Sequence, residues 1–142
     1  MSNWERWIKR YVWDDERTPY LVSPERMTRR QADYEIFAYS VFLSCLFFIA
    51  SLASASSPMA TFYTLSILAC AVILGFTKHA RAAAYCATAP VAAALYLALG
   101  GFPAGLGKLD YAVIITLIML WAAYGFRVIG IANAYEDMRD SQ

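Results

Sequence analysis

RAAAYCATAPVAAALYLALGG, residues 81–101, is an apolar run in which alanine is the commonest residue. A transmembrane helix needs roughly 20 such residues to cross the bilayer. Alanine side chains cover a lipid-facing surface poorly, but they let neighbouring helices approach closely. The run therefore predicts the central helix of a small transmembrane bundle, in which Ala83, Ala87 and Ala94 face other helices.

The composition of the whole chain is that of a membrane protein. Of 142 residues, 60% are hydrophobic and 16% are charged, against about 45–50% and about 25% in soluble domains. Charged residues are concentrated in residues 1–32 and are few in residues 36–131. A single domain is expected at this length, and the segregation of charge indicates that the domain is embedded in a membrane.

Three further apolar runs accompany the alanine-rich one, and short polar, basic or glycine-rich breaks separate them. The predicted spans are residues 33–53, 59–77, 80–100 and 110–132, within a transmembrane domain of residues 33–137. Because the connections are short, sequential helices are expected to pack as antiparallel neighbours. The predicted fold is an all-α polytopic membrane protein with four transmembrane helices in an up-down antiparallel bundle. A short tail, residues 138–142, follows it.

Lys and Arg residues lie almost entirely on one side of the predicted bundle. The N-terminal segment, the connector at residues 77–81 and the C-terminal end hold all of the 12 basic residues except Lys108. The positive-inside rule then predicts cytoplasmic N- and C-termini, in what we expect to be a bacterial inner membrane. A nucleic-acid partner is not expected, because acidic residues dilute the basic ones in the N-terminal segment.

The N-terminal segment, residues 1–32, is predicted to be cytoplasmic and to begin with an amphipathic helix. Trp4, Trp7 and Tyr11 fall on one helical face, and Lys9 and Arg10 lie on the opposite face. Trp and Tyr favour the headgroup region and basic residues favour anionic lipid, so an interfacial helix is predicted. The alternative is that this stripe packs on a partner protein or on the cytoplasmic ends of the same chain.

Two prolines mark positions where helix geometry is expected to change. Pro24 follows Ser23, a good capping residue, and predicts the start of a helix that runs without a break to about Ser51. Pro90 lies in the middle of the alanine-rich span and removes one backbone hydrogen bond there. It is expected to kink that helix, as a packing feature or as a hinge, with Thr88 satisfying the freed carbonyl.

Arg127 is the one strong charge within an apolar stretch. It lies roughly 25 Å along a helix axis from Asp110, which places it near the cytoplasmic border. Its side chain is predicted to extend to the lipid headgroups, or to form an ion pair with Asp33 or Glu35 if the first and fourth helices adjoin. The alternative is a contact with a substrate or cofactor.

The sequence holds no motif for catalysis, and no catalytic residue, cofactor or metal ion is expected. His79 is the single histidine, and one histidine cannot supply both axial ligands of a bis-histidine haem. Cys45, Cys70 and Cys86 lie in apolar spans without metal-site spacing, so they are expected to pack as small apolar residues. No acidic or basic residue occupies a predicted membrane midplane, where an ion-coupled transporter normally has one.

A four-span chain without chemistry of its own is predicted to be a non-catalytic accessory or structural subunit of a larger membrane protein complex, such as an energy-converting one. It would stabilise assembly through contacts with other membrane subunits and with lipids, in a hetero-oligomer. One alternative is a small homo-oligomeric transporter or channel. Another is an enzyme that acts on lipid at the cytoplasmic face through His79.

Overall fold

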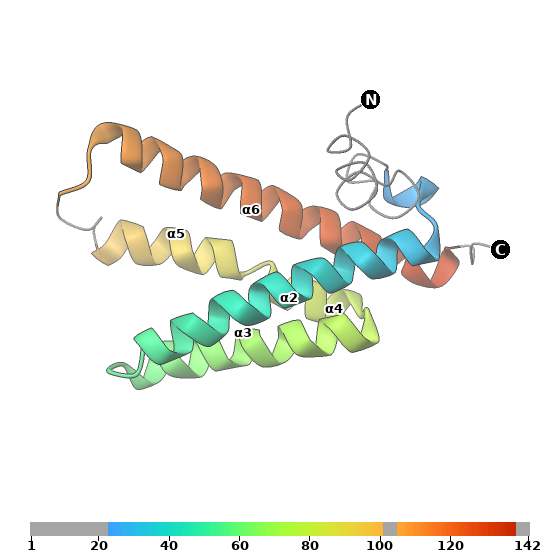
Figure 1. The fold of residues 1–142 in the computed structure, drawn as a ribbon, viewed down its shortest axis with the longest axis horizontal. Coiled ribbons are helices and arrows are strands. Elements are labelled where there is room, and N and C mark those ends of the chain that lie inside the picture. Colours follow the sequence, from blue (N-terminus) through green and yellow to red (C-terminus); the bar gives the residue numbers. More distant parts are fainter. Residues whose placement is uncertain (1–22, 101–104, 139–142) are drawn as a thin grey trace, which may run out of the picture.

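The computed structural model describes residues 23–100 and 105–138, and over these residues the protein is all-α, without a strand (Figure 1). Its elements, in chain order, are η1 (Pro24–Arg26), α2 (Arg29–Ala53), α3 (Pro58–Thr77), α4 (Ala80–Cys86), α5 (Ala89–Gly100), α6 (Lys108–Ala134) and η2 (Tyr135–Asp137). Within the described residues, four helical stretches are long and apolar enough to cross a membrane: Arg29–Ala53, Pro58–Thr77, Ala80–Gly100 and Lys108–Asp137. The predictions of an all-α class and of four helices of membrane-spanning length are confirmed.

The first membrane-length helix begins at Arg29 and not at Pro24. Pro24 opens the short helix η1, after which Met27 and Thr28 have extended backbone angles. The Thr28 hydroxyl accepts a hydrogen bond from the Gln31 backbone at 3.4 Å, and the Gln31 side chain accepts one from the Thr28 backbone at 2.9 Å. This reciprocal cap fixes a new helix start, so the prediction of one continuous helix from Pro24 was wrong.

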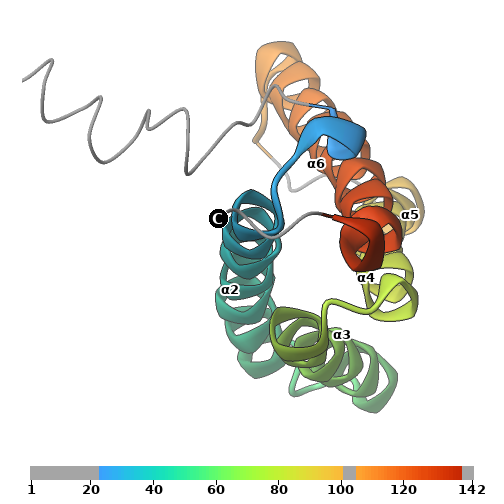
Figure 2. The same ribbon diagram turned by 90° about the vertical axis from the view of Figure 1, so that its right-hand side faces the viewer.

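Helices α2 and α3 lie side by side along their length and form the best-packed pair of the molecule (Figures 1 and 2). One stripe of α2 is buried at spacings of three and four residues; it comprises Ala32, Glu35, Ile36, Tyr39, Ser40, Leu43, Phe47 and Ser51. The two helices come close together at Gly75 of α3, where an added Cβ atom would lie 3.2 Å from the Ser40 Cβ. Small residues at this crossing let the two backbones meet.

The alanine-rich span is two helices and not one. Helix α4 ends at Cys86, Ala87 and Thr88 form a turn, and α5 begins at Ala89. Pro90 therefore lies in the first turn of α5, where the missing backbone N–H would have no partner in its own helix. The Thr88 hydroxyl and backbone N–H both donate to the Tyr85 carbonyl, at 2.7 and 3.1 Å. A change of helix geometry was expected at Pro90, and the structure has a full break just before it, at Ala87 and Thr88.

Helix α6 is the longest element, and its buried residues are confined to its last ten positions. These residues are Gly125, Val128, Ile131 and Ala132. Val128, Ile131 and Ala132 belong to the same buried core as Ile36 of α2 and Leu74 of α3. The first half of α6 diverges from α2 and lies along α5 (Figure 1). The part of the core to which α6 contributes is therefore at one end of the molecule, and Figure 2 shows α2, α3, α4 and α6 around it.

Candidate functional site

A buried ion pair joins α2 to α6 at the end of the molecule that carries η1 and η2. The Arg127 Nε donates to the Glu35 Oε1 at 2.6 Å, and the Arg127 Nη2 donates to the Glu35 Oε2 at 3.2 Å. The Glu35 side chain is 3% exposed and the Arg127 side chain is 21% exposed. Met27 places its sulfur 3.9 Å from the Arg127 Nη2. This two-point geometry fixes the relative position of the two helices as well as neutralising both charges.

Asp33 lies beside this pair but bonds to other partners. It accepts a hydrogen bond from the Tyr135 hydroxyl at 2.7 Å, and its Oδ1 lies 3.8 Å from the Lys78 Nζ. Arg29 lies over the Tyr135 ring, 5.0 Å from the ring centroid. Lys78 also donates to the Gly75 carbonyl, and it ends α3 in a left-handed conformation. We refer to Arg29, Asp33, Glu35, Lys78, Arg127 and Tyr135 as the polar end.

Of the two acids predicted as partners of Arg127, the structure brings Glu35 to it and leaves Asp33 to bond with Tyr135 and Lys78. Asp33, Glu35 and Arg127 lie at the same end of the molecule because α2 and α6 adjoin there. No signal in the sequence pointed to the roles of Met27, Lys78 and Tyr135, which lie just outside the ends of α2, α3 and α6. Their contacts depend on where those segments end in space.

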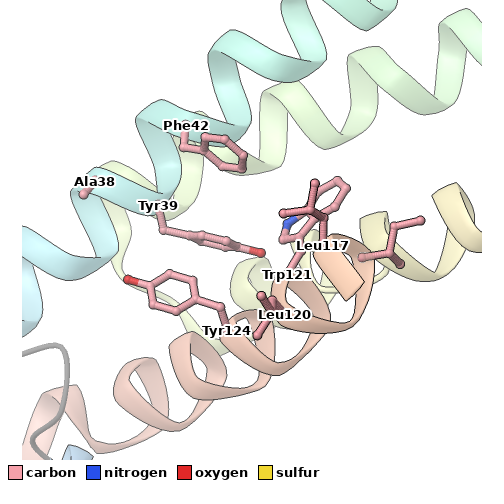
Figure 3. Close-up of a pocket in the computed structure, with 8 residues that line it drawn as sticks. Ala38, Tyr39, Phe42, Leu117, Leu120, Trp121 and Tyr124 are labelled. Carbon is pink, nitrogen blue, oxygen red and sulfur yellow. The ribbon is translucent and has the colours of Figure 1, made fainter. Parts of the chain in front are cut away.

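An apolar groove opens between α2 and α6 about one helical turn from the ion pair (Figure 3). Its volume is about 680 Å³, and it is lined by Ala38, Tyr39, Phe42, Leu117, Ile118, Leu120, Trp121 and Tyr124. Four of these are aromatic. The Tyr39 and Tyr124 rings are 5.5 Å apart between centroids, and the Phe42 and Trp121 rings meet edge to face at 6.5 Å. We call this cavity the aromatic groove.

Two polar atoms in the wall of the aromatic groove lack hydrogen-bond partners among the described residues. These are the Tyr39 hydroxyl and the Trp121 Nε1, and both are buried. Tyr39 extends from α2 toward α6, and the two polar atoms face each other in Figure 3 without the geometry of a hydrogen bond. Buried polar groups are nearly always paired, and both atoms lie beneath the surface of the groove, against each other.

The predicted helix-packing residues separate into two groups. Ala83 and Pro90 are buried, and Ala87 lies so close to α6 that a Cβ added at Gly125 would be 3.4 Å from the Ala87 Cβ. Ala94 is exposed on α5. Ala94 does not pack in the core of the described part of the chain, because α5 leaves the core after its first turn, and the expectation that it faces another helix stays a prediction.

Several other predicted positions lie outside the described residues or on the surface of the protein. Trp4, Trp7, Lys9, Arg10 and Tyr11 lie outside the described residues, as does any interfacial helix that they form. His79 is exposed and precedes α4. Among residues 23–100 and 105–138, no group of three or more His, Cys, Asp or Glu side chains is placed to hold a metal ion.

The chain matches no protein-family model, and the comparisons found no match among curated proteins or solved structures.

Proposed function

We propose that the four spans cross a bacterial inner membrane in alternating directions, with the polar end and both termini on the cytoplasmic side. The basic residues Arg29, Arg30 and Lys78 lie at the polar end, and Lys108 begins α6 at the opposite end (Figure 1). Positively charged residues are retained preferentially on the cytoplasmic side of the membrane. The charge distribution therefore supports this orientation.

The function that we propose is that of a non-catalytic accessory subunit, which binds a partner transmembrane subunit through α5 and the first half of α6. One observation carries the proposal: α5 buries only Ala89 and Pro90, and α6 buries nothing before Gly125. In a membrane, helices associate through close packing of small residues and not through hydrophobicity. The exposed small residues Ala94 and Ala98 suit a protein neighbour better than lipid.

Lipid is the default neighbour of any exposed apolar surface, and the large exposed side chains of α2 and α3 fit lipid well. Phe37, Phe48, Phe62 and Phe76 belong to this class. The outer face of α5 differs because alanines separate its large side chains, so it has room for a second helix at short distance. This contrast distinguishes the proposed contact surface from the lipid-facing surface of the α2–α3 pair.

The test is purification of the tagged full chain in mild detergent, followed by mass spectrometry of the intact complex. We expect a complex with another membrane protein in a fixed ratio. Ala94→Leu should dissociate this complex, because the larger side chain blocks close helix approach. Ala69→Leu, at an exposed alanine of α3, is the matched control and should leave the complex intact.

Two outcomes would overturn the subunit proposal. The first is an assembly that contains copies of this chain only, which is the composition expected of a small homo-oligomeric transporter or channel. The second is a hetero-complex that Ala94→Leu and Ala69→Leu weaken equally, because α5 would then have no special part in it.

A further inference from the structure

A second apolar groove runs along α4 and α5, which pack against α3 and α6. Its volume is about 540 Å³, and Phe126 of α6 is one of the residues that line it. Four other lining residues follow one another at spacings of three and four: Ala84, Thr88, Val91 and Leu95. At 1.5 Å per helical residue they cover roughly 16 Å, so the cavity is elongated along the membrane-spanning direction. We call it the α4–α5 groove.

The hydroxyl groups beside the α4–α5 groove already have partners within the protein. The Thr88 hydroxyl donates to the Tyr85 carbonyl at 2.7 Å, and the Tyr63 hydroxyl lies 3.1 Å from the Thr88 hydroxyl. In the same way, the Ser66 hydroxyl donates to the Tyr63 carbonyl at 2.7 Å, and the Tyr85 hydroxyl lies 2.8 Å from the Ser66 hydroxyl. Every hydroxyl hydrogen is thus bonded inside the protein, and the groove selects its occupant by shape and apolarity.

Arg81 lies at one end of the α4–α5 groove. It precedes Ala84 by three residues and Tyr85 by four within α4, and residues at these spacings share one face of a helix. Arg81 is exposed, and among the described residues its side chain makes no ion pair or hydrogen bond. The exposed acids Glu136 and Asp137 at this end belong to η2 and do not line the groove.

Arg81 differs in this respect from the basic residues around it. Arg127 and Lys78 each lie beside a carboxylate, and Arg29 and Arg30 each lie over a tyrosine ring. Arg81 is the second residue of a stretch long enough to cross a membrane, so it lies at the border of that membrane. A basic residue there attracts anionic headgroups, and a guanidinium group binds a phosphate through two parallel hydrogen bonds.

We propose that the α4–α5 groove holds an acyl chain of an anionic phospholipid whose phosphate group is bound by Arg81. A cation at the membrane border, followed by an apolar groove along the helices, matches the order of phosphate and acyl chain in such a lipid. The uncompensated charge of Arg81 favours a headgroup with net negative charge over a zwitterionic one. The proposal does not depend on the subunit role, because Arg81 and the groove belong to one chain.

The binding test compares two lipids with identical acyl chains. The full chain is delipidated in detergent and titrated with dioleoyl phosphatidylglycerol or dioleoyl phosphatidylcholine, and native mass spectrometry measures the fraction that carries one lipid. We expect phosphatidylglycerol to half-saturate at a concentration roughly threefold to tenfold lower than phosphatidylcholine. Arg81→Gln should remove this preference. Arg26→Gln makes the same change at an exposed arginine of η1 and should retain it.

A second pair of variants tests whether the acyl chain occupies the groove. Ala84→Phe fills the α4–α5 groove from an exposed position and should weaken the binding of both lipids at least threefold. Ala69→Phe makes the same change at an exposed alanine of α3 outside the groove and should leave both unchanged. If Ala84→Phe does not fold, Arg81→Gln still tests the proposal, because it changes an exposed side chain.

Four outcomes would overturn the proposal. Equal half-saturation by the two lipids would mean that no headgroup is recognised. Equal losses in Arg81→Gln and Arg26→Gln would assign the preference to the overall positive charge of this end. Unchanged binding to Ala84→Phe would place the acyl chain elsewhere. Loss of the bound lipid from an intact complex with another membrane protein would assign the groove to that protein.

Discussion

The α2–α3 pair and the α5–α6 pair are both apolar helical pairs, yet the chain packs them very differently. In α2 one stripe is buried along the whole helix, whereas α5 buries only its first two residues. The difference follows from specific close contacts between the helices and not from how apolar the helices are. Gly75 and Ser40 permit close approach of α2 and α3, whereas no glycine among the described residues packs α5 against α6 in this way. Close complementary contacts, rather than hydrophobic content, decide which membrane helices pack.

Among the described residues, the ion pair and the side-chain hydrogen bonds that link α2 to α6 and η2 lie at the polar end. Glu35 of α2 and Arg127 of α6 form the ion pair that joins them, and the Tyr135–Asp33 bond lies nearby. The four predictions below test whether these anchors account for the difference between the pairs. They run from the largest expected effect to the smallest.

Glu35→Ala should have the largest effect, because it leaves the guanidinium of Arg127 without its carboxylate in a largely buried site. Breaking such a pair costs about 3 kcal/mol, measurable as a loss of unfolding free energy in detergent. Asp33→Ala is the control: its carboxylate is 43% exposed, and we expect a loss of about 1 kcal/mol or less. Equal losses for the two variants would show that the ion pair is not the main anchor between the pairs.

Ala87→Leu should disturb the junction of α4 and α6, because Ala87 lies against Gly125. Overpacking at such a contact costs about 2 kcal/mol. Ala94→Leu, on the exposed face of α5, should change the unfolding free energy of the isolated chain by less than about 0.5 kcal/mol. Thermal unfolding of both variants in the same detergent compares them. A larger loss for Ala94→Leu would contradict the packing difference described here.

Gly75→Ala should weaken the α2–α3 pair, since its new Cβ would lie 3.2 Å from the Ser40 Cβ. The strain exceeds the gain in helix propensity, and we expect a net loss of about 1 kcal/mol. Gly100→Ala, at the end of α5, has no neighbour within 4 Å and should be neutral or slightly stabilising. Chemical unfolding in mixed micelles measures both, and destabilisation by Gly100→Ala would indicate packing around the end of α5.

Tyr39→Phe should have the smallest effect on stability. Its hydroxyl has no hydrogen-bond partner, so removing it from the ligand-free protein should leave the unfolding free energy unchanged or raise it by up to about 1 kcal/mol. Tyr135→Phe makes the same chemical change at a hydroxyl that donates to Asp33 at 2.7 Å, and it should lower stability by about 1 kcal/mol. The opposite order would mean that the Tyr39 hydroxyl is paired in the free protein.

The candidate site was predictable from the sequence in part. Arg127 stood out because an isolated charge in an apolar run needs a partner, and Asp33 and Glu35 were the acids at a similar depth. The choice of Glu35 depends on helix rotation, which puts Glu35 in the buried stripe of α2 and Asp33 at its edge. The aromatic groove was not predicted, because nothing in the sequence shows that aromatic residues of the first and fourth spans meet.

The sequence by itself determined the all-α class, the four membrane-length helices and their approximate limits. Those properties depend on apolar length and on the residues that break a helix, and both are local. Tertiary structure alone decided that the alanine-rich span divides at Ala87 and Thr88, that Ala94 is exposed, and that Tyr39 meets Trp121. Each depends on the distance and rotation between helices, which are set by side chains far apart in sequence. The alanine-rich stretch therefore contributes a buried first half to the core and an exposed second half to the surface.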